Sequence, residues 1–192
     1  VEKYPEARGV GKRLGEVERH GVVHRIDRET SGALILAKTV KGHAFLKEQF
    51  QNRGIEKIYH LFVYGLMKED RGSINLPIKR SSGDFRKRTA MKRPLDSARG
   101  KEALTYFEVL KRDENNNVTF VEAKPKTGRT HQIRVHFQAL HHPVLGDNLY
   151  ASGKPELLGF TRTALHARKV TFKNLNGEEI TVNYNGEPDD KT

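Results

Sequence analysis

The chain has 192 residues, the size of one domain or of a domain with a large elaboration. Its 35 lysines and arginines outnumber 24 acidic residues, and the resulting net charge of +11 attracts polyanions, so RNA or DNA is the expected partner. The absence of cysteine excludes disulfides, thiolate nucleophiles and thiolate-rich zinc sites, and no segment reaches the ~20 consecutive apolar residues of a membrane span. We therefore expect a cytoplasmic protein with no membrane partner.

The beginning of the chain shows no sustained periodicity. Residues 1–21 are polar and rich in glycine, which predicts an N-terminal arm or a truncated start, with the folded domain over residues 22–192. The short apolar run 33–37 is bounded by Gly32 and Lys38 and predicts a strand buried on both faces. Thr39 can then cap a helix that continues to about Asn52.

Strand signals dominate the middle and the end of the chain. The aromatic and β-branched residues of 58–65 predict a strand. Segments 103–110 and 118–123 flank a run of turn-forming residues and should pair as a hairpin, and Asn176-Gly177 signals another. Because strands do not alternate regularly with helices, we expect an α+β domain with a mixed, largely antiparallel sheet and flanking helices.

A second helix is expected to begin near Thr130. Its apolar residues Ile133, Phe137 and Leu140 recur at helical spacing. The polar residues on another face could point into a cleft; they are His131, Arg134 and Gln138.

The segment 79–101 is strongly basic and has few apolar residues. It is expected to project, either as a solvated loop or as a clamp on a phosphate backbone. Its cationic side chains are Arg80, Arg86, Lys87, Arg88, Lys92, Arg93 and Arg99.

Two stretches, 24–32 and 128–136, are dense in side chains that could carry chemistry. Asp27 lies between Arg25 and Arg28, and nearby positive charge favours an ionised carboxylate, which can act as a nucleophile or a base. The alternative for Asp27 is a structural ion pair or a turn cap.

Other chemistries find little support. The histidines at 20, 24, 136, 141 and 142 invite a metal site, but none of them forms a known ligand signature with a companion acid. The glycines of residues 9–15 follow no predicted strand and lack the Gly-Lys-Ser/Thr ending of a nucleotide-phosphate loop, and there is no Gly-x-Ser-x-Gly elbow. We expect neither metal nor cofactor.

Three motifs, in this order, resemble those of RluA-like RNA pseudouridine synthases. His24-Arg25-Ile26-Asp27-Arg28-Glu29-Thr30-Ser31-Gly32 is similar to the His-Arg-Leu-Asp-x-x-Thr-Ser-Gly motif of that family, and Lys57-Ile58-Tyr59 to its Lys-x-Tyr motif. Residues 128–136, continued by 142–150, resemble its third motif, and the similarity runs from about Val22 to Val182. Ile26 replaces the usual leucine at similar volume, whereas the early Asn-Lys-Pro segment of the family is missing.

The resemblance implies the pseudouridine synthase fold with a central RNA-binding cleft, a catalytic domain over residues 22–192, and isomerisation of uridines in ribosomal or transfer RNA without a cofactor. Asp27 would attack or deprotonate the sugar of the target uridine, and Arg134 would pair with Asp27 and hold it ionised. Tyr59 would stack on the extruded base, with help in removing the proton from the ring carbon that forms the new bond as a second role. Arg25 would fill the gap left in the RNA. The expected RNA-binding side chains are Arg25, Arg28, Arg80, Arg86, Lys87, Arg88, Arg129 and His131.

Two functions of other classes stay open. A catalytically silent basic module for RNA binding or ribosome assembly would keep the fold and the positive surface, although the intact Asp27 argues against it. A metal-dependent phosphodiesterase built on the histidines would be sensitive to chelators. We expect the protein to be a monomer.

Overall fold

The computed structural model describes residues 5–10, 20–91 and 100–184. These residues form two compact units. The first unit takes its described residues from segments 1–26, 32–57 and 167–192, and the second takes its described residues from segments 27–31 and 58–166. Both units are discontinuous in sequence. The predicted boundary after residue 21 stays a prediction.

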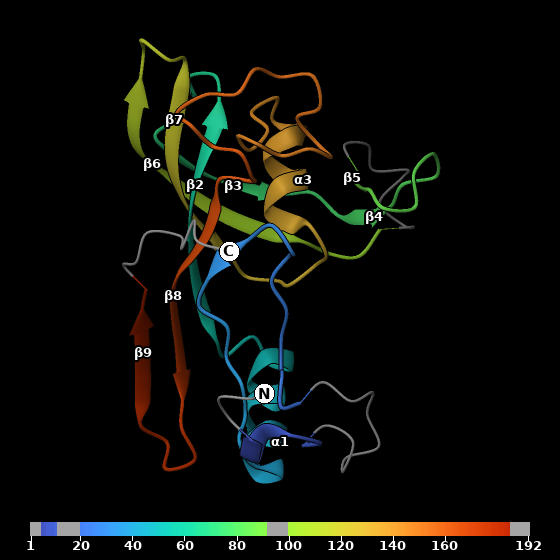
Figure 1. Cartoon of the computed structure of the whole chain (residues 1–192), viewed down its shortest axis with the longest axis vertical. Coiled ribbons are helices and arrows are strands. Elements are labelled where there is room, and N and C mark those ends of the chain that lie inside the picture. The colour runs from blue at the N-terminus through green and yellow to red at the C-terminus, as the bar shows by residue number, and fades with distance from the viewer. Residues whose placement is uncertain (1–4, 11–19, 92–99, 185–192) are drawn as a thin grey trace. The chain divides into compact units, whose positions relative to one another are not determined.

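An antiparallel sheet with strand order β2-β7-β6-β3 forms the second unit (Figure 1). The strands are β2 (Glu56–Tyr64), β3 (Arg71–Asn75), β6 (Leu104–Asp113) and β7 (Val118–Pro125), and β2 enters this unit at Ile58. The predicted strand over 58–65 and the predicted hairpin around 113–117 are confirmed. Asn117 ends the connection with φ 51°, a left-handed conformation that asparagine tolerates better than most residues. The α+β class with a largely antiparallel sheet is confirmed.

Helix α3 (Gln132–Ala139) contributes to the core of this unit. Ile133 and Phe137 pack in one buried cluster with Leu61 of β2 and Val121 of β7. The helix is confirmed, but its predicted polar face is wrong: Gln138 is exposed, whereas Arg134 is only 4% exposed. A buried guanidinium requires charged partners, and these partners define the site described below.

The basic segment begins as a short hairpin rather than a loop. β4 (Ile78–Arg80) pairs antiparallel with β5 (Arg88–Ala90), and β5 lies beside α3 (Figure 1). Ile78 and Met91 are buried and anchor the base of this hairpin. Three cationic residues of the segment lie outside the described residues, namely Lys92, Arg93 and Arg99.

The first unit contains η1 (Pro5–Ala7), α1 (Val40–Gln51) and most of the hairpin of β8 (Leu165–Lys173) and β9 (Glu179–Asn183). α1 begins as predicted, because the side chain of Thr39 accepts a hydrogen bond from the Gly42 N–H at 3.0 Å. The β8–β9 turn is also confirmed; Gly177 adopts φ 82° there, which a residue without Cβ does at little cost.

The predicted strand over 33–37 is wrong. β1 covers only Ser31–Gly32, and within the apolar run only Leu36 forms an isolated bridge, to Val22. Burial alternates instead of covering both faces: Ile35 and Ala37 are buried, but Leu36 is 37% exposed. The reason lies in the hydrogen bonding, since the Ile35 N–H donates to the His24 side chain at 2.9 Å and not to a neighbouring strand.

No helix among the described residues is both long enough and apolar enough to cross a membrane.

Candidate active site

Asp27 and Arg134 form an ion pair in the second unit. Nη1 of Arg134 donates to Oδ2 of Asp27 at 3.1 Å, and the two side chains are 4% and 13% exposed, respectively. Asp27 begins a turn closed by the Thr30 N–H, which donates to the Asp27 carbonyl at 3.0 Å. The pair predicted from sequence is therefore present, and it joins segments 107 residues apart.

Asp147 accepts two further hydrogen bonds from the Arg134 guanidinium. Nε donates to Oδ2 of Asp147 at 2.6 Å and Nη2 to Oδ1 at 2.8 Å, a bidentate geometry that fixes the plane of the guanidinium. The Asp147 carboxylate is fully buried, and its Oδ1 also accepts the backbone N–H groups of Leu149 and Tyr150. Burial opposes the charge on Arg134, but the hydrogen bonds and charge of Asp147, with those of Asp27, raise the pKa of the guanidinium above its usual value. Arg134 is thus a fixed cation shared by two carboxylates.

Tyr59 lies on β2, where it pairs in register with Ala123 and packs against the core cluster of the second unit. Burial, aided by the negative charge of Asp27, raises the pKa of the Tyr59 phenol to about 12. Both effects disfavour the phenolate, so Tyr59 is a neutral phenol at pH 7.

His131 lies beside the ion pair, although the sequence predicted that it binds RNA. Its Nε2 is 4.0 Å from Oδ1 of Asp27, and its Nδ1 is 2.8 Å from the Tyr150 hydroxyl. That hydroxyl accepts the backbone N–H of Arg88 in β5, also at 2.8 Å. His131 precedes α3 with φ 57°, a conformation that costs a non-glycine residue of order 1–3 kcal/mol and is often found at functional sites.

The buried amide of Gln132 fixes the loop that leads into α3. Its Oε1 accepts hydrogen bonds from the Thr127 hydroxyl and the Arg129 N–H, and its Nε2 donates to the Leu104 carbonyl and the Thr105 hydroxyl. Every polar capacity of the amide is used, which rigidifies the segment carrying His131.

The other predicted RNA-binding side chains lie in several separate parts of the chain. Arg25 belongs to the first unit and Arg28 to the second, and both are exposed. Nε of Arg129 donates to the Glu102 carbonyl at 2.9 Å. The remaining four lie on the β4–β5 hairpin: Arg80, Arg86, Lys87 and Arg88.

Partners within the hairpin already engage two of these cations. Nη1 of Arg88 donates to the carbonyls of Phe85 and Lys87. Arg86 makes a bidentate pair with Asp84, whose pKa these hydrogen bonds lower to about 2. Arg80, by contrast, stands directly opposite Arg88 in the register.

Sequence reasoning missed Asp147 and Tyr150 as members of the site. Both lie in the 142–150 stretch of the third motif, but no role was assigned to either. A carboxylate with a tyrosine three residues later is unremarkable until the fold brings both to Arg134, whose guanidinium carbon lies 5.1 Å from the centre of the Tyr150 ring. Phe85, 78% exposed between β4 and β5, was also missed.

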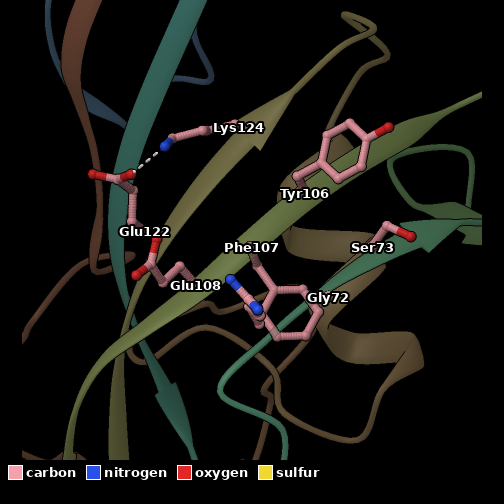
Figure 2. A pocket seen from close by; sticks show the side chains of 8 residues that line it. Gly72, Ser73, Tyr106, Phe107, Glu108, Glu122 and Lys124 are labelled. Atoms are coloured by element: carbon pink, nitrogen blue, oxygen red, sulfur yellow. Dashed lines mark ion pairs between the residues drawn. The ribbon is translucent and has the colours of Figure 1, made fainter.

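A separate hollow of about 410 Å³ lies over β3, β6 and β7 (Figure 2). Its lining includes Arg71 and Lys124 but also Glu108 and Glu122, so its charges are mixed, and Lys124 is paired with Glu122 at 2.9 Å. None of the residues around Asp27 lines it. Among the described residues, no group of three or more histidine and acidic side chains could hold a metal ion.

Comparison with known proteins agrees with this geometry. A 50% identical "uncharacterized RNA pseudouridine synthase" of Aquifex aeolicus matches over 137 residues, 71% of this chain and 42% of that protein. The dual-specificity RNA pseudouridine synthase RluA of Vibrio cholerae is 42% identical over 152 residues, 79% of this chain and 58% of that one. The chain thus spans about half the length of these curated relatives.

Comparisons with solved structures and with protein-family models also identify pseudouridylate synthases as similar proteins. The structure of human RNA Pseudouridylate Synthase Domain Containing 1 superposes with a TM-score of 0.76 at 31% identity, covering 86% of this chain and 68% of that one. The model of the family described as RNA pseudouridylate synthase matches residues 4–139, well over half of the sequence. The chain therefore belongs to the RNA pseudouridylate synthase family.

Proposed function

We propose that the protein isomerises uridines in RNA to pseudouridine and that Asp27 is its catalytic carboxylate. The observation that carries the proposal is the enclosed ion pair of Asp27 with Arg134, a cation that also donates two hydrogen bonds to Asp147. Such a fixed cation orients the carboxylate before the substrate arrives.

The reaction is balanced without a co-reactant. The bond from C1′ of the ribose to N1 of uracil breaks, the base turns over, and a bond from C1′ to C5 forms. The proton on C5 is lost and N1 gains one, so the product is an isomer of the substrate. Asp27 acts on the sugar, either by attack or by removal of a proton, and it returns unchanged.

Tyr59 serves in this scheme as a stacking surface for the extruded base. Because its pKa is raised to about 12, its hydroxyl keeps its proton at neutral pH, which favours stacking and hydrogen bonding over proton removal by a phenolate. Extrusion of a base costs a few kcal/mol of lost stacking, and contacts to the flanking RNA must offset that cost. The cations of the β4–β5 hairpin, together with Arg25, Arg28 and Arg129, are suited to that task.

Several finer features belong to the same proposal. We expect ribosomal or transfer RNA as the substrate, since the curated relatives include dual-specificity RNA and ribosomal large subunit pseudouridine synthases. We further expect action in the cytoplasm, as a monomer, without metal or cofactor.

The test is pseudouridine formation in unmodified ribosomal and transfer RNA, without added metal, by the wild type and by Asp27→Asn. The substitution keeps the size of the side chain and removes its charge. We expect product with the wild type and none with Asp27→Asn, with RNA affinity retained by the variant. The position of the product in the RNA identifies the substrate.

Tight RNA binding by both proteins, with no product from either on any RNA, would instead support the silent binding module. Activity that requires added metal or is abolished by a chelator would contradict the proposed chemistry.

A further inference from the structure

Asp27 offers its two carboxylate oxygens to different neighbours. Oδ2 accepts from Arg134 at 3.1 Å, whereas Oδ1 faces Nε2 of His131 at 4.0 Å. Oδ1 is thus the oxygen that is not bound to the guanidinium, and His131 is the side chain that stands beside it.

The hydrogen bonds of Tyr150 determine which nitrogen of His131 carries the proton. The Tyr150 oxygen accepts the Arg88 N–H, since a backbone amide can only donate. The hydroxyl proton then has Nδ1 of His131 as its acceptor at 2.8 Å, and this orientation satisfies all three groups. A neutral His131 consequently carries its proton on Nε2, the nitrogen that faces Asp27.

The environment of His131 favours the neutral ring. Burial is the main cause that lowers its pKa below the usual value; the charge of Asp27 opposes this effect, while those of Arg134 and Arg88 add to it. Burial also raises the pKa of the Tyr150 hydroxyl, which keeps the proton that it donates.

We propose that His131 is a positioning residue: its Nε2–H, oriented by Tyr150 and directed at Oδ1 of Asp27 across 4.0 Å, attracts that oxygen electrostatically and so helps to orient the carboxylate. This inference rests on the proposed function and assigns His131 a role that differs from the RNA contact expected from its sequence position. Because the Arg88 amide belongs to β5, the hydrogen bonds from Arg88 to Tyr150 and from Tyr150 to His131 connect the β4–β5 hairpin to His131.

Two substitutions of His131 separate the two nitrogens. In His131→Gln the side-chain amide reaches the place of Nε2 and can still donate toward Asp27, whereas in His131→Asn the shorter amide replaces only the Nδ1 side. Asparagine tolerates the left-handed conformation of residue 131 at least as well as histidine does, so a defect in His131→Asn is not explained by backbone strain.

Turnover of the RNA substrate is measured first. We expect kcat of His131→Asn to fall by about 10- to 100-fold with little change in KM, because the loss is one of orientation. His131→Gln should recover most of that loss. Tyr150→Phe alone should lower kcat, but combined with His131→Asn it should cause no further decrease in kcat. A raised KM with unchanged kcat in His131→Asn would overturn the proposal and return His131 to RNA binding.

The second measurement does not depend on activity. Nitrogen-15 NMR of the ring distinguishes the two neutral tautomers, and the resonance of His131 is the one that His131→Asn removes. We expect a protonated Nε2 and an unprotonated Nδ1 in the wild type, and a mixture of tautomers in Tyr150→Phe. A protonated Nδ1 in the wild type would refute the inference even if pseudouridine forms. If the tautomer is as expected but no RNA is turned over, the proposed function fails and the geometry of His131 stands.

Discussion

At the scale of single residues, the site depends on one guanidinium that serves two carboxylates of different burial. Asp147 is fully enclosed and binds Arg134 through two hydrogen bonds, while the Asp27 side chain is 13% exposed and binds it through one. Removing a partner from a buried pair leaves an uncompensated charge, which is costlier than the pair is stabilising. Asp147 is therefore the structural anchor of Arg134, whereas the more exposed Asp27 is the carboxylate to which we assign the proposed catalytic role.

This difference predicts unequal losses of stability. Asp147→Asn leaves Arg134 buried with one carboxylate and should lower the free energy of unfolding by about 3–5 kcal/mol. Asp27→Asn, its matched control, keeps the bidentate partner and should cost about 1 kcal/mol. Denaturation by urea at pH 7 measures both. Equal losses in the two variants would show that Asp147 is not the anchor of Arg134.

The sequence predicted the members of the proposed catalytic set but not the residues that hold them in place. Asp27 was predicted from its flanking arginines, and Tyr59 and Arg134 came from the motif resemblance. The anchoring role of Asp147 depends on the turn after α3, which places its carboxylate against a helical residue 13 positions earlier. No local pattern encodes that approach, and for the same reason the sequence did not predict that His131 lies 4.0 Å from Asp27.

At the scale of elements, local signals decided which predictions succeeded. The Thr39 cap and the Asn176-Gly177 turn act within a few residues, and both predicted elements form. The run 33–37 failed because a distant group competes for its backbone: the His24 ring accepts the Ile35 N–H and stacks on Phe50 with ring centres 4.7 Å apart. His24 thereby fixes the segment that leads toward Asp27.

The burial of His24 predicts a loss of stability in acid. Burial first, and the charge of Lys57 second, lower the pKa of His24 to about 4, against 6.5 for a free imidazole. Between pH 6.5 and 4, His24 is therefore protonated in the unfolded chain but stays neutral in the folded chain. Above pH 6.5, His24 does not affect the free energy of unfolding. As the pH decreases from 6.5 to 4, its contribution lowers the free energy of unfolding by a total of about 3 kcal/mol.

His24→Gln tests this assignment. The amide oxygen of glutamine can still accept the Ile35 N–H, but it does not titrate, so the variant should be less stable at pH 8 and yet lose less stability between pH 6.5 and 4. Chemical denaturation across that range measures the slope, with His141→Gln as a baseline for removing an exposed histidine. An unchanged slope in His24→Gln would assign the acid sensitivity to other groups.

At the scale of the whole molecule, the order of the three motifs predicted the family and the fold class. The division into two compact units had no counterpart in the sequence, because each unit is assembled from separate segments of the chain. The net charge of +11 indicated a polyanion but not where it binds. The β4–β5 hairpin is a candidate binding surface, since Arg80 and Arg88 stand directly opposite each other. A bound phosphate would reduce the repulsion between these two like charges.

The hairpin predicts two distinguishable contributions to RNA affinity. Arg80→Gln removes the proposed phosphate contact, so the slope of log K against log salt should become shallower by about 1, with weaker binding at low salt. Phe85→Ala removes an aromatic surface that is 78% exposed; it should cost about 1–3 kcal/mol of stacking at every salt concentration and leave the slope unchanged.

Titrations of RNA binding at several salt concentrations separate these effects, and Lys111→Gln, an exposed cation on β6, is the matched charge control. If Lys111→Gln flattened the slope as much as Arg80→Gln, the salt dependence would come from net charge and not from a localised contact. If Phe85→Ala changed the slope and did not weaken binding equally at every salt concentration, the aromatic side chain would act by holding the hairpin and not by stacking on RNA.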